Sequence, residues 1–285
     1  MARLERRPTR ARISRRHVRI KVRGRLGNHR LEFFLLIMFA VAGTGARSDA
    51  KAAGAKTAFD MREAQFRILS ADGQQTIGTT RFKSLSNNSN EEINGETVYV
   101  DGERDSEYER LSAADVHAAP RLDTYRHSFF NADGSLLMVD ALDASSGVAS
   151  CTRYASGGAK TRTSKLKVPR DAYAGVSGLM TIVGALRQGM REIRFHEFAC
   201  APGPAIFSVV AFVPDRSERW PLYRGDLVRL DLRPDLGALS MLIAPFMPRI
   251  DAWFNPGDNW DYVGGEFDRY FRGPHVLTVR ISPND

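Results

Sequence analysis

The stretch YRHSFFNADGSLLMVDAL, residues 125–142, determines the fold class that this sequence predicts. In its first part Tyr125, His127 and Phe129 alternate with Arg126 and Ser128, which is typical of a strand with one buried face. The central NADG consists largely of turn formers, and the LLMVDAL that follows is mostly apolar. The stretch therefore predicts an antiparallel β-hairpin.

Similar short runs lie on both sides of this hairpin. They predict strands at residues 64–68, 76–83, 97–100, 148–154, 161–168, 193–200, 205–213, 227–233 and 276–281. The run 161–168 is rich in lysine, which favours an edge strand. The polar run 86–92 contains three asparagines and predicts a loop.

One segment changes from the period of a strand to that of a helix. Apolar residues at i, i+3, i+4, i+7 and i+10 predict an amphipathic helix over residues 176–188, with Gly189 ending it. About ten strands with one or two helices predict a mainly β (α+β) fold. We expect a large curled antiparallel sheet or incomplete β-barrel with one or two helices packed on its concave side.

The positive charge of the chain is confined to its start. Of 41 basic and 33 acidic residues, residues 1–46 hold 12 and 2, which leaves 29 and 31 for residues 47–285. A nucleic-acid-binding protein needs a basic surface to neutralise phosphates. The near-neutral balance of the remaining chain therefore argues against a nucleic-acid partner.

The basic segment leads into an apolar run of signal-peptide length. Residues 31–42 are too few to span a bilayer, which takes about 20 residues, and small residues follow with cleavage expected after Ala42 or Ala46. The alternative is an uncleaved anchor or a buried core helix. Because the basic part is unusually long, a true start near Val18, Val22 or Leu26 is a further hypothesis.

The whole chain divides into three segments. We assign residues 1–46 to a signal peptide, residues 47–60 to a disordered leader and residues 61–285 to a single β-rich domain. The two cysteines, Cys151 and Cys200, both fall in the exported part, which predicts a disulfide in an oxidising compartment. The alternative is two separate buried thiols.

Candidate ligand contacts come from an apolar stretch after residue 236 that two prolines interrupt, which favours a short helix or a kinked lid. Its apolar residues and those that follow either line a hydrophobic cavity or belong to the core. The candidate lining residues are Leu239, Leu242, Ile243, Phe246, Met247, Trp253 and Phe254.

Signatures of catalysis and metal binding are not found in the sequence. It contains no nucleophile elbow, no phosphate-binding or dinucleotide glycine motif and no His-Glu-x-x-His. His196 and Cys200 are spaced for one face of a helix, but the local alternation favours a strand, on which they stand about 13 Å apart. We therefore expect no catalytic residue, no metal site and no cofactor.

The layout of strands resembles a family of exported bacterial proteins of unknown function. The resemblance rests on the opening hairpin from Phe66 to Phe82, the Asp133-Gly134 turn, the PRDAY segment at 169–173 before the helix, and the closing strands. Those proteins are similar to the half-barrels that carry lipoproteins in the bacterial envelope. The resemblance implies a periplasmic protein with a concave apolar surface.

Three functions are compatible with these features. The first is an exported, non-enzymatic envelope protein that binds a lipid or another apolar or amphipathic small molecule in a half-barrel. The second is a hydrolase-type enzyme with a dispersed site around His127, His196 and nearby acids. The third is a structural partner in an envelope assembly, which a large apolar patch would favour. A transient contact with a membrane surface is compatible with the basic run 160–170, and the oligomeric state stays open.

Overall fold

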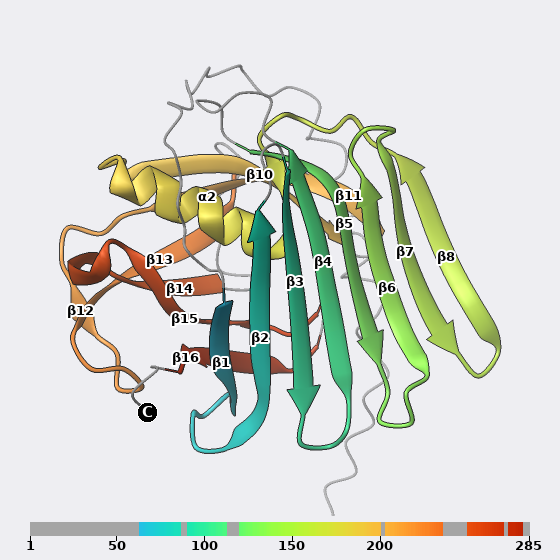
Figure 1. Ribbon diagram of the computed structural model, residues 1–285, viewed down its shortest axis with the longest axis horizontal. Helices are drawn as coiled ribbons and strands as arrows, with labels where there is room; N and C mark the ends of the chain where they lie inside the picture. The colour runs from blue at the N-terminus through green and yellow to red at the C-terminus, as the bar shows by residue number, and fades with distance from the viewer. Residues whose placement is uncertain are drawn as a thin grey trace, which may run out of the picture. The chain divides into compact units, whose positions relative to one another are not determined.

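A computed structural model describes residues 63–86, 90–112, 120–200, 203–235, 250–270 and 273–281, all within the unit Asp49–Asp285. These residues form strands, the α-helix α2 and the short 3-10 helix η3 (Figure 1). The strands are β1 (Glu63–Ser70), β2 (Thr76–Ser86), β3 (Asn90–Tyr99), β4 (Arg104–Ser112), β5 (Arg121–Phe130), β6 (Leu136–Asp143), β7 (Val148–Ala155), β8 (Gly158–Lys165), β9 (Ala172–Tyr173), β10 (Glu192–Cys200), β11 (Pro204–Phe212), β12 (Glu218–Arg219), β13 (Asp226–Pro234), β14 (Ile250–Asn255), β15 (Asp261–Asp268) and β16 (His275–Arg280). The helices are α2 (Gly175–Arg187) and η3 (Pro256–Asp258).

All sixteen strands belong to one open sheet. Its order is β8-β7-β6-β5-β4-β3-β2-β1-β16-β15-β14-β13-β11-β10-β9, and β12 pairs with β13 off this path. The first eight strands form a continuous antiparallel meander, and only β9 runs parallel to its neighbour β10. Antiparallel neighbours need only short turns, which explains why so much of the chain is strand.

The hairpin that the sequence predicts most directly is confirmed as β5 and β6. Phe129 pairs with Met138, and the Asn131 amide donates to the Ser135 carbonyl across the turn at 2.8 Å. Gly134 has a φ of +83°, a conformation that glycine adopts without steric cost. The Asp133 carboxylate accepts a hydrogen bond from the Ser135 amide, which closes the turn.

The predicted loop over residues 86–92 is wrong for the residues that the structure describes. Strand β2 ends at Ser86 and strand β3 begins at Asn90, and Ser86 pairs with Glu91, whereas residues 87–89 lie outside the described residues. Residues 90–92 carry no apolar alternation, but the ladder between two long neighbouring strands satisfies their backbone. Tertiary pairing therefore extends these strands beyond their local preference.

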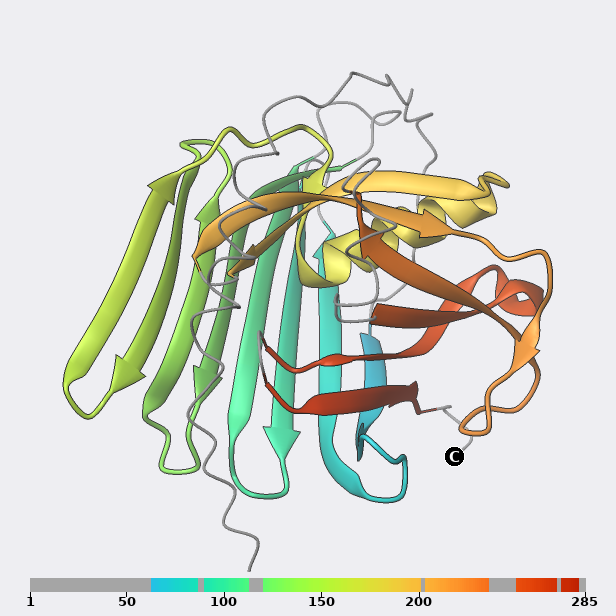
Figure 2. The same cartoon turned by 180° about the vertical axis from the view of Figure 1, so that it is seen from behind.

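The helix α2 confirms the predicted segment at 176–188 and lies in the curl of the sheet (Figures 1 and 2). Its residues Ile182, Val183 and Leu186 are almost completely buried. They belong to one hydrophobic core with residues from both halves of the sheet, including Phe66 of β1 and Phe254 of β14. The helix therefore packs on the concave side, and the fold class predicted from the sequence is confirmed.

The two ends of the sheet approach one another without forming a ladder. Contacts join β5 to β9, β10 to β6, and β11 to both β7 and β8. The disulfide between Cys151 of β7 and Cys200 of β10 crosses this gap, with a Cα–Cα distance of 5.8 Å. The predicted disulfide is confirmed, and its position makes it a covalent link across the curl. No helix among the described residues is long and apolar enough to cross a bilayer.

Candidate functional site

The predicted ligand-lining residues fall into two groups. Leu239, Leu242, Ile243, Phe246 and Met247 lie outside the described residues. Trp253 and Phe254 are neighbours on β14 and belong to different hydrophobic clusters. Trp253 stacks on Trp220 with ring centroids 5.2 Å apart, whereas Phe254 contacts Tyr262 in the main core. The structure therefore does not bring these two side chains together on one surface.

A different group of polar side chains comes together inside the curl. Register pairs place Glu107 of β4 opposite His127 of β5, and His127 opposite Asp140 of β6. Two residues further along β4, on the same face of the sheet, Glu109 lies opposite Tyr125. The strand β10 contributes Glu197, whose charge interacts with that of Glu107. We call Glu107, Glu109, Tyr125, His127, Asp140 and Glu197 the interior polar cluster.

Two carboxyl groups of this cluster cap the helix α2. The Ser177 amide donates to both carboxylate oxygens of Glu109 at 3.2 Å, and the Val176 amide donates to Glu107 Oε1 at 3.3 Å. The N-cap residue Ala174 supplies no side-chain cap of its own, so two strand residues accept hydrogen bonds from amides of the first turn. The pair thereby fixes the helix onto β4.

The approach of Glu107 to the helix requires a glycine at residue 175. Gly175 has a φ of +47°, and a Cβ there would lie 1.6 Å from Glu107 Oε1. A side chain at this position would therefore both strain the backbone and displace the capping carboxylate.

Burial and the charge of Glu107 raise the pKa of two acids of the cluster, Glu109 and Glu197. Burial is the main cause that raises the pKa of Glu109 well above its ordinary value, and the charge and hydrogen bond of Glu107 add to it. Burial, and then the charge of Glu107, raise the pKa of Glu197 to about 7. Burial also raises the pKa of Tyr125, and the neighbouring carboxylates act in the same direction. The raised pKa of Glu109 favours its protonated form at neutral pH, whereas Glu197, with a pKa of about 7, is close to half protonated there.

His127 connects the cluster to a buried arginine. Its Nδ1 lies 3.3 Å from the Tyr125 hydroxyl, and its Nε2 lies 3.4 Å from Asp105 Oδ1. Burial alone would lower the pKa of His127, but the Asp105 hydrogen bond and the surrounding carboxylates together raise it. Asp105 Oδ2 in turn lies 3.6 Å from Nε of Arg269, a side chain that is only 6% exposed.

Replacing Glu197 with glutamine tests the acidity of the cluster. A raised folded-state pKa means that the fold holds a proton that the unfolded chain has lost. The free energy of unfolding of the wild type should therefore fall as pH rises from about 4.5 to about 7. We expect E197Q to equal the wild type near pH 4.5 and to be more stable by about 1–3 kcal/mol at pH 8.

Urea unfolding at several pH values measures this effect. Glu192→Gln, at the exposed end of the same strand, is the matched control and should not change the pH profile. Destabilisation of E197Q at pH 8 would contradict the assignment, because it would mean that the ionised carboxylate is favoured in the fold.

The histidines of the hydrolase hypothesis have separate partners. His127 belongs to the interior polar cluster, whereas His196 Nδ1 pairs with Asp171 at 2.9 Å and is one-third exposed. Acids surround His127, but two of them, Glu107 and Glu109, already accept hydrogen bonds from helix amides. The arrangement can store and share protons, and two of its carboxyl groups bind the first turn of α2.

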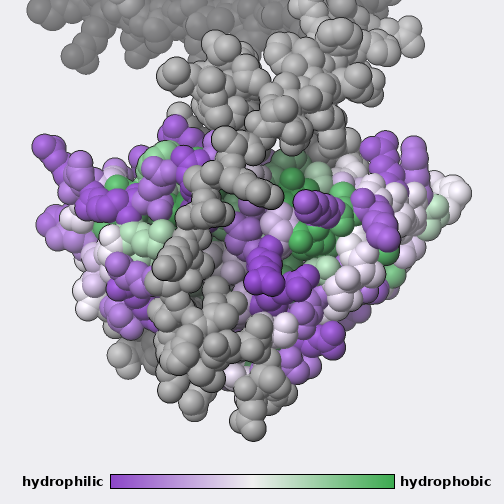
Figure 3. Space-filling view, turned by 90° about the horizontal axis from the view of Figure 1, so that it is seen from above, coloured by the Kyte–Doolittle hydropathy of each residue, from purple (hydrophilic) through white to green (hydrophobic). Residues whose placement is uncertain are grey.

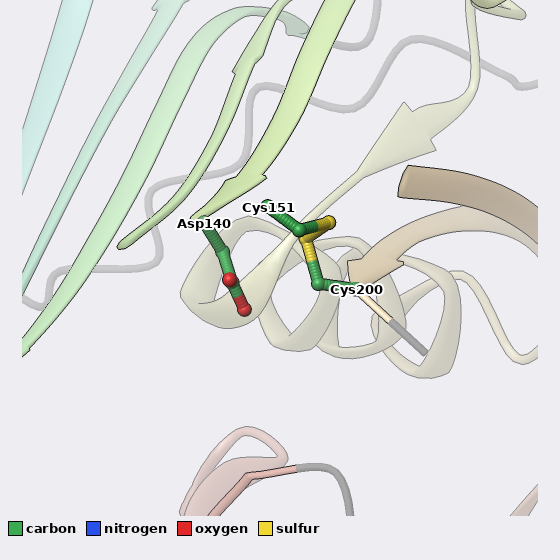
Figure 4. A group of neighbouring side chains, drawn as sticks. All are labelled: Asp140, Cys151 and Cys200. Carbon is green, nitrogen blue, oxygen red and sulfur yellow. A yellow bond between two sulfur atoms is a disulfide. The ribbon is translucent and has the colours of Figure 1, made fainter. Parts of the chain in front are cut away.

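The disulfide lies next to a carboxylate in an arrangement that resembles a metal site by distance alone. Ligand atoms of Asp140, Cys151 and Cys200 lie within 4.8 Å of one another (Figure 4). The two sulfurs are bonded to each other, so neither is the thiolate that a metal requires. The Asp140 carboxylate is also paired with Arg153. The oxidised chain therefore offers no ligand set here.

A pocket of about 350 Å³ is lined by residues outside the interior polar cluster. We call it the Tyr99 pocket. It lies between the turn after β3, residue Ile77 of β2 and the connection from β15 to β16. It is lined by Ile77, Tyr99, Val100, Asp101, Glu103, Arg269, Tyr270, Pro274 and Val276. This volume is at the lower end of the range for small-molecule sites.

The described surface is mixed in character. Seen from above, hydrophobic areas alternate with hydrophilic side chains (Figure 3). Large exposed apolar residues such as Leu85, Val148 and Phe212 are distributed over separate strands. This distribution gives no support to the hypothesis of a structural partner, which needs one large patch.

Sequence reasoning missed the strand that carries the capping carboxylates. The inward-facing positions of β4 include Asp105, Glu107 and Glu109, all of them acidic. Apolar alternation, the usual signal of a strand, is therefore replaced by acidic alternation. An alternating row of acids in a β-rich sequence was the available signal.

Comparisons with known proteins give one match to report. No family model matches the sequence, and no curated protein matches it. Among solved structures, the chain is similar to the crystal structure of a β-barrel-like protein of the domain of unknown function DUF1849 from Brucella abortus. The TM-score is 0.42 at 9% identity, and the match covers 77% of this chain and 95% of that chain.

Proposed function

We propose that this chain is an exported, non-enzymatic protein of the bacterial envelope that binds a lipid or another apolar or amphipathic small molecule in its half-barrel. The observation that carries the proposal is the disulfide Cys151–Cys200 across the curl of the sheet. Disulfides that hold a fold together persist in oxidising compartments and are rare in the cytosol. The basic segment and apolar run at residues 1–46 give independent support for export.

The shape of the scaffold supports binding. The curled sheet is linked across its gap by a disulfide, and rigid scaffolds position binding residues well. The candidate lining residues between Leu239 and Met247 stay a prediction. The two described candidates, Trp253 and Phe254, are packed against other aromatic rings.

Native mass spectrometry of protein purified from the periplasm without detergent tests the proposal. We expect a mass above that of the polypeptide under native conditions, and the polypeptide mass alone after denaturation. A protein that carries no ligand and also takes up no N-phenyl-1-naphthylamine, an apolar fluorescent dye, would contradict the proposed function.

A second candidate, an enzyme that uses acid–base chemistry, is favoured by one observation. Glu107 and Glu109 hydrogen-bond to one another, and Glu197 has a pKa of about 7, which suits proton transfer at neutral pH. Glu109 is completely buried and the Tyr99 pocket does not reach it. Hydrolysis of an ester or glycoside by the wild type but not by Glu109→Gln would favour this candidate.

A further inference from the structure

Positive charge gathers in one segment of the β-rich domain, residues 144–170, which we call the basic arm. Of the 29 basic and 31 acidic residues in 47–285, the basic arm holds 6 and 0, which leaves 23 and 31 for the rest. The basic arm therefore has a net charge of +6, whereas the rest of this stretch has a net charge of −8. Such a separation of charge favours a partner that carries negative charge.

The basic arm forms one end of the sheet. It contains β7 and β8, which pair with one another, and β8 is the last strand in the sheet order. Figures 1 and 2 show β8 at the outer edge of the sheet. Seven of its eight residues are exposed, so both of its faces are accessible. Long side chains on the two faces of an edge strand can bend toward one common plane along that edge.

Four basic side chains of the arm have no acidic partner among the described residues. All four are exposed, on β8 or on the segment that follows it: Lys160, Lys165, Lys167 and Arg170. The other two bases are engaged elsewhere. Arg153 pairs with Asp140 of β6. Arg162 extends toward Gly203, which precedes β11. The four unpaired charges therefore make the arm a basic surface along the outer edge.

The composition of β8 favours a membrane over a protein as the partner. Its sequence, GAKTRTSK, has no large apolar side chain that could anchor a protein interface. Lysines on an edge strand also discourage pairing with a strand of another chain. The charge of an anionic bilayer, by contrast, is spread over a plane and attracts clustered lysines and arginines. Tyr154, 37% exposed near the turn of the arm, is of a type enriched at the level of the head groups.

We infer that the basic arm binds the surface of a bilayer that contains anionic phospholipids. The four unpaired bases lie against the lipid phosphates, and the edge of β8 runs along the membrane plane. Each base near an anionic surface contributes to binding, and salt screens this contribution. The inference goes beyond the proposed function, because it concerns the outer edge of the sheet and not its curl.

Sedimentation of the periplasmic protein with lipid vesicles tests the partner. Vesicles of phosphatidylcholine alone are compared with vesicles in which phosphatidylglycerol replaces one third of the lipid. We expect a partition coefficient at least tenfold higher on the anionic vesicles. At about 1 M salt, where the Debye length is about 3 Å, this difference should disappear. Equal binding to both kinds of vesicle at low salt, or binding to neither, would overturn the inference.

Two variants with the same loss of charge test the site. The arm variant changes three exposed lysines of the arm: Lys160→Gln, Lys165→Gln and Lys167→Gln. The control variant changes three exposed bases elsewhere: Lys83→Gln, Arg216→Gln and Arg224→Gln. We expect the arm variant to bind anionic vesicles at least tenfold more weakly than the wild type, and the control variant less than threefold more weakly. Equal losses would mean that binding follows net charge, and would overturn the assignment to the arm.

An acidic segment of another protein is the alternative partner, and octaglutamate is the probe for it. Binding of octaglutamate that the arm variant loses, together with no binding of the wild type to anionic vesicles, would assign the arm to an acidic peptide and overturn the membrane assignment. Native mass spectrometry reports the ligand in the curl independently. If vesicle binding fails while the protein still carries a ligand, the inference fails and the proposed function stands.

Discussion

Replacing both Cys151 and Cys200 with alanine is expected to lower the free energy of unfolding by about 4 kcal/mol. The disulfide closes a loop with a sequence separation of 49 residues, so it removes many conformations from the unfolded chain. It also joins β7 to β10, which no backbone ladder connects. Urea unfolding of oxidised wild type and of the double variant measures the difference.

Reduction of the wild type provides the control for this prediction. Reduced wild type and the double variant should unfold at similar urea concentrations, and a reducing agent should leave the double variant unchanged. If oxidised and reduced wild type were equally stable, the disulfide would not hold the curl together.

The second large effect is expected from Gly175→Ala. A Cβ at Gly175 would meet the capping oxygen of Glu107, and the φ of +47° disfavours any side chain. Loss of the cap and backbone strain together should cost about 3 kcal/mol, each contributing about 1–2 kcal/mol. Thermal or urea unfolding measures this cost.

A second glycine of the same helix region separates the two causes. Gly189 has a φ of +75°, but nothing lies within 4 Å of a Cβ built there. Gly189→Ala should therefore show the backbone cost alone, about 1–2 kcal/mol. Equal losses in the two variants would contradict the capping role of Glu107.

Several parts of the fold could be predicted because the local sequence and the tertiary structure agree. The alternation of Tyr125, His127 and Phe129 before a turn ending in Gly134 specifies a hairpin without help from the rest of the chain. The apolar residues of 176–186 specify a helix in the same way. Cys151 and Cys200 could be paired because no other cysteine competes.

The interior polar cluster could not be predicted, because its signals depend on distant parts of the chain. Glu107 and Glu109 read locally as solvent-facing acids, and only the docking of α2 gives them buried partners. Likewise, Arg269 lies far in sequence from Tyr99 and Glu103, and only the order of the strands brings them together. Long-range register of this kind leaves no local periodicity.

The intact mass of the protein isolated from bacterial cells that express the full-length chain tests the central claim, export into an oxidising compartment, most directly. The account predicts a periplasmic protein that has lost its N-terminal residues up to Ala42 or Ala46. It also predicts a mass lower by two hydrogen atoms than after reduction, because Cys151 and Cys200 are bonded. A full-length cytoplasmic chain with two free thiols would contradict it.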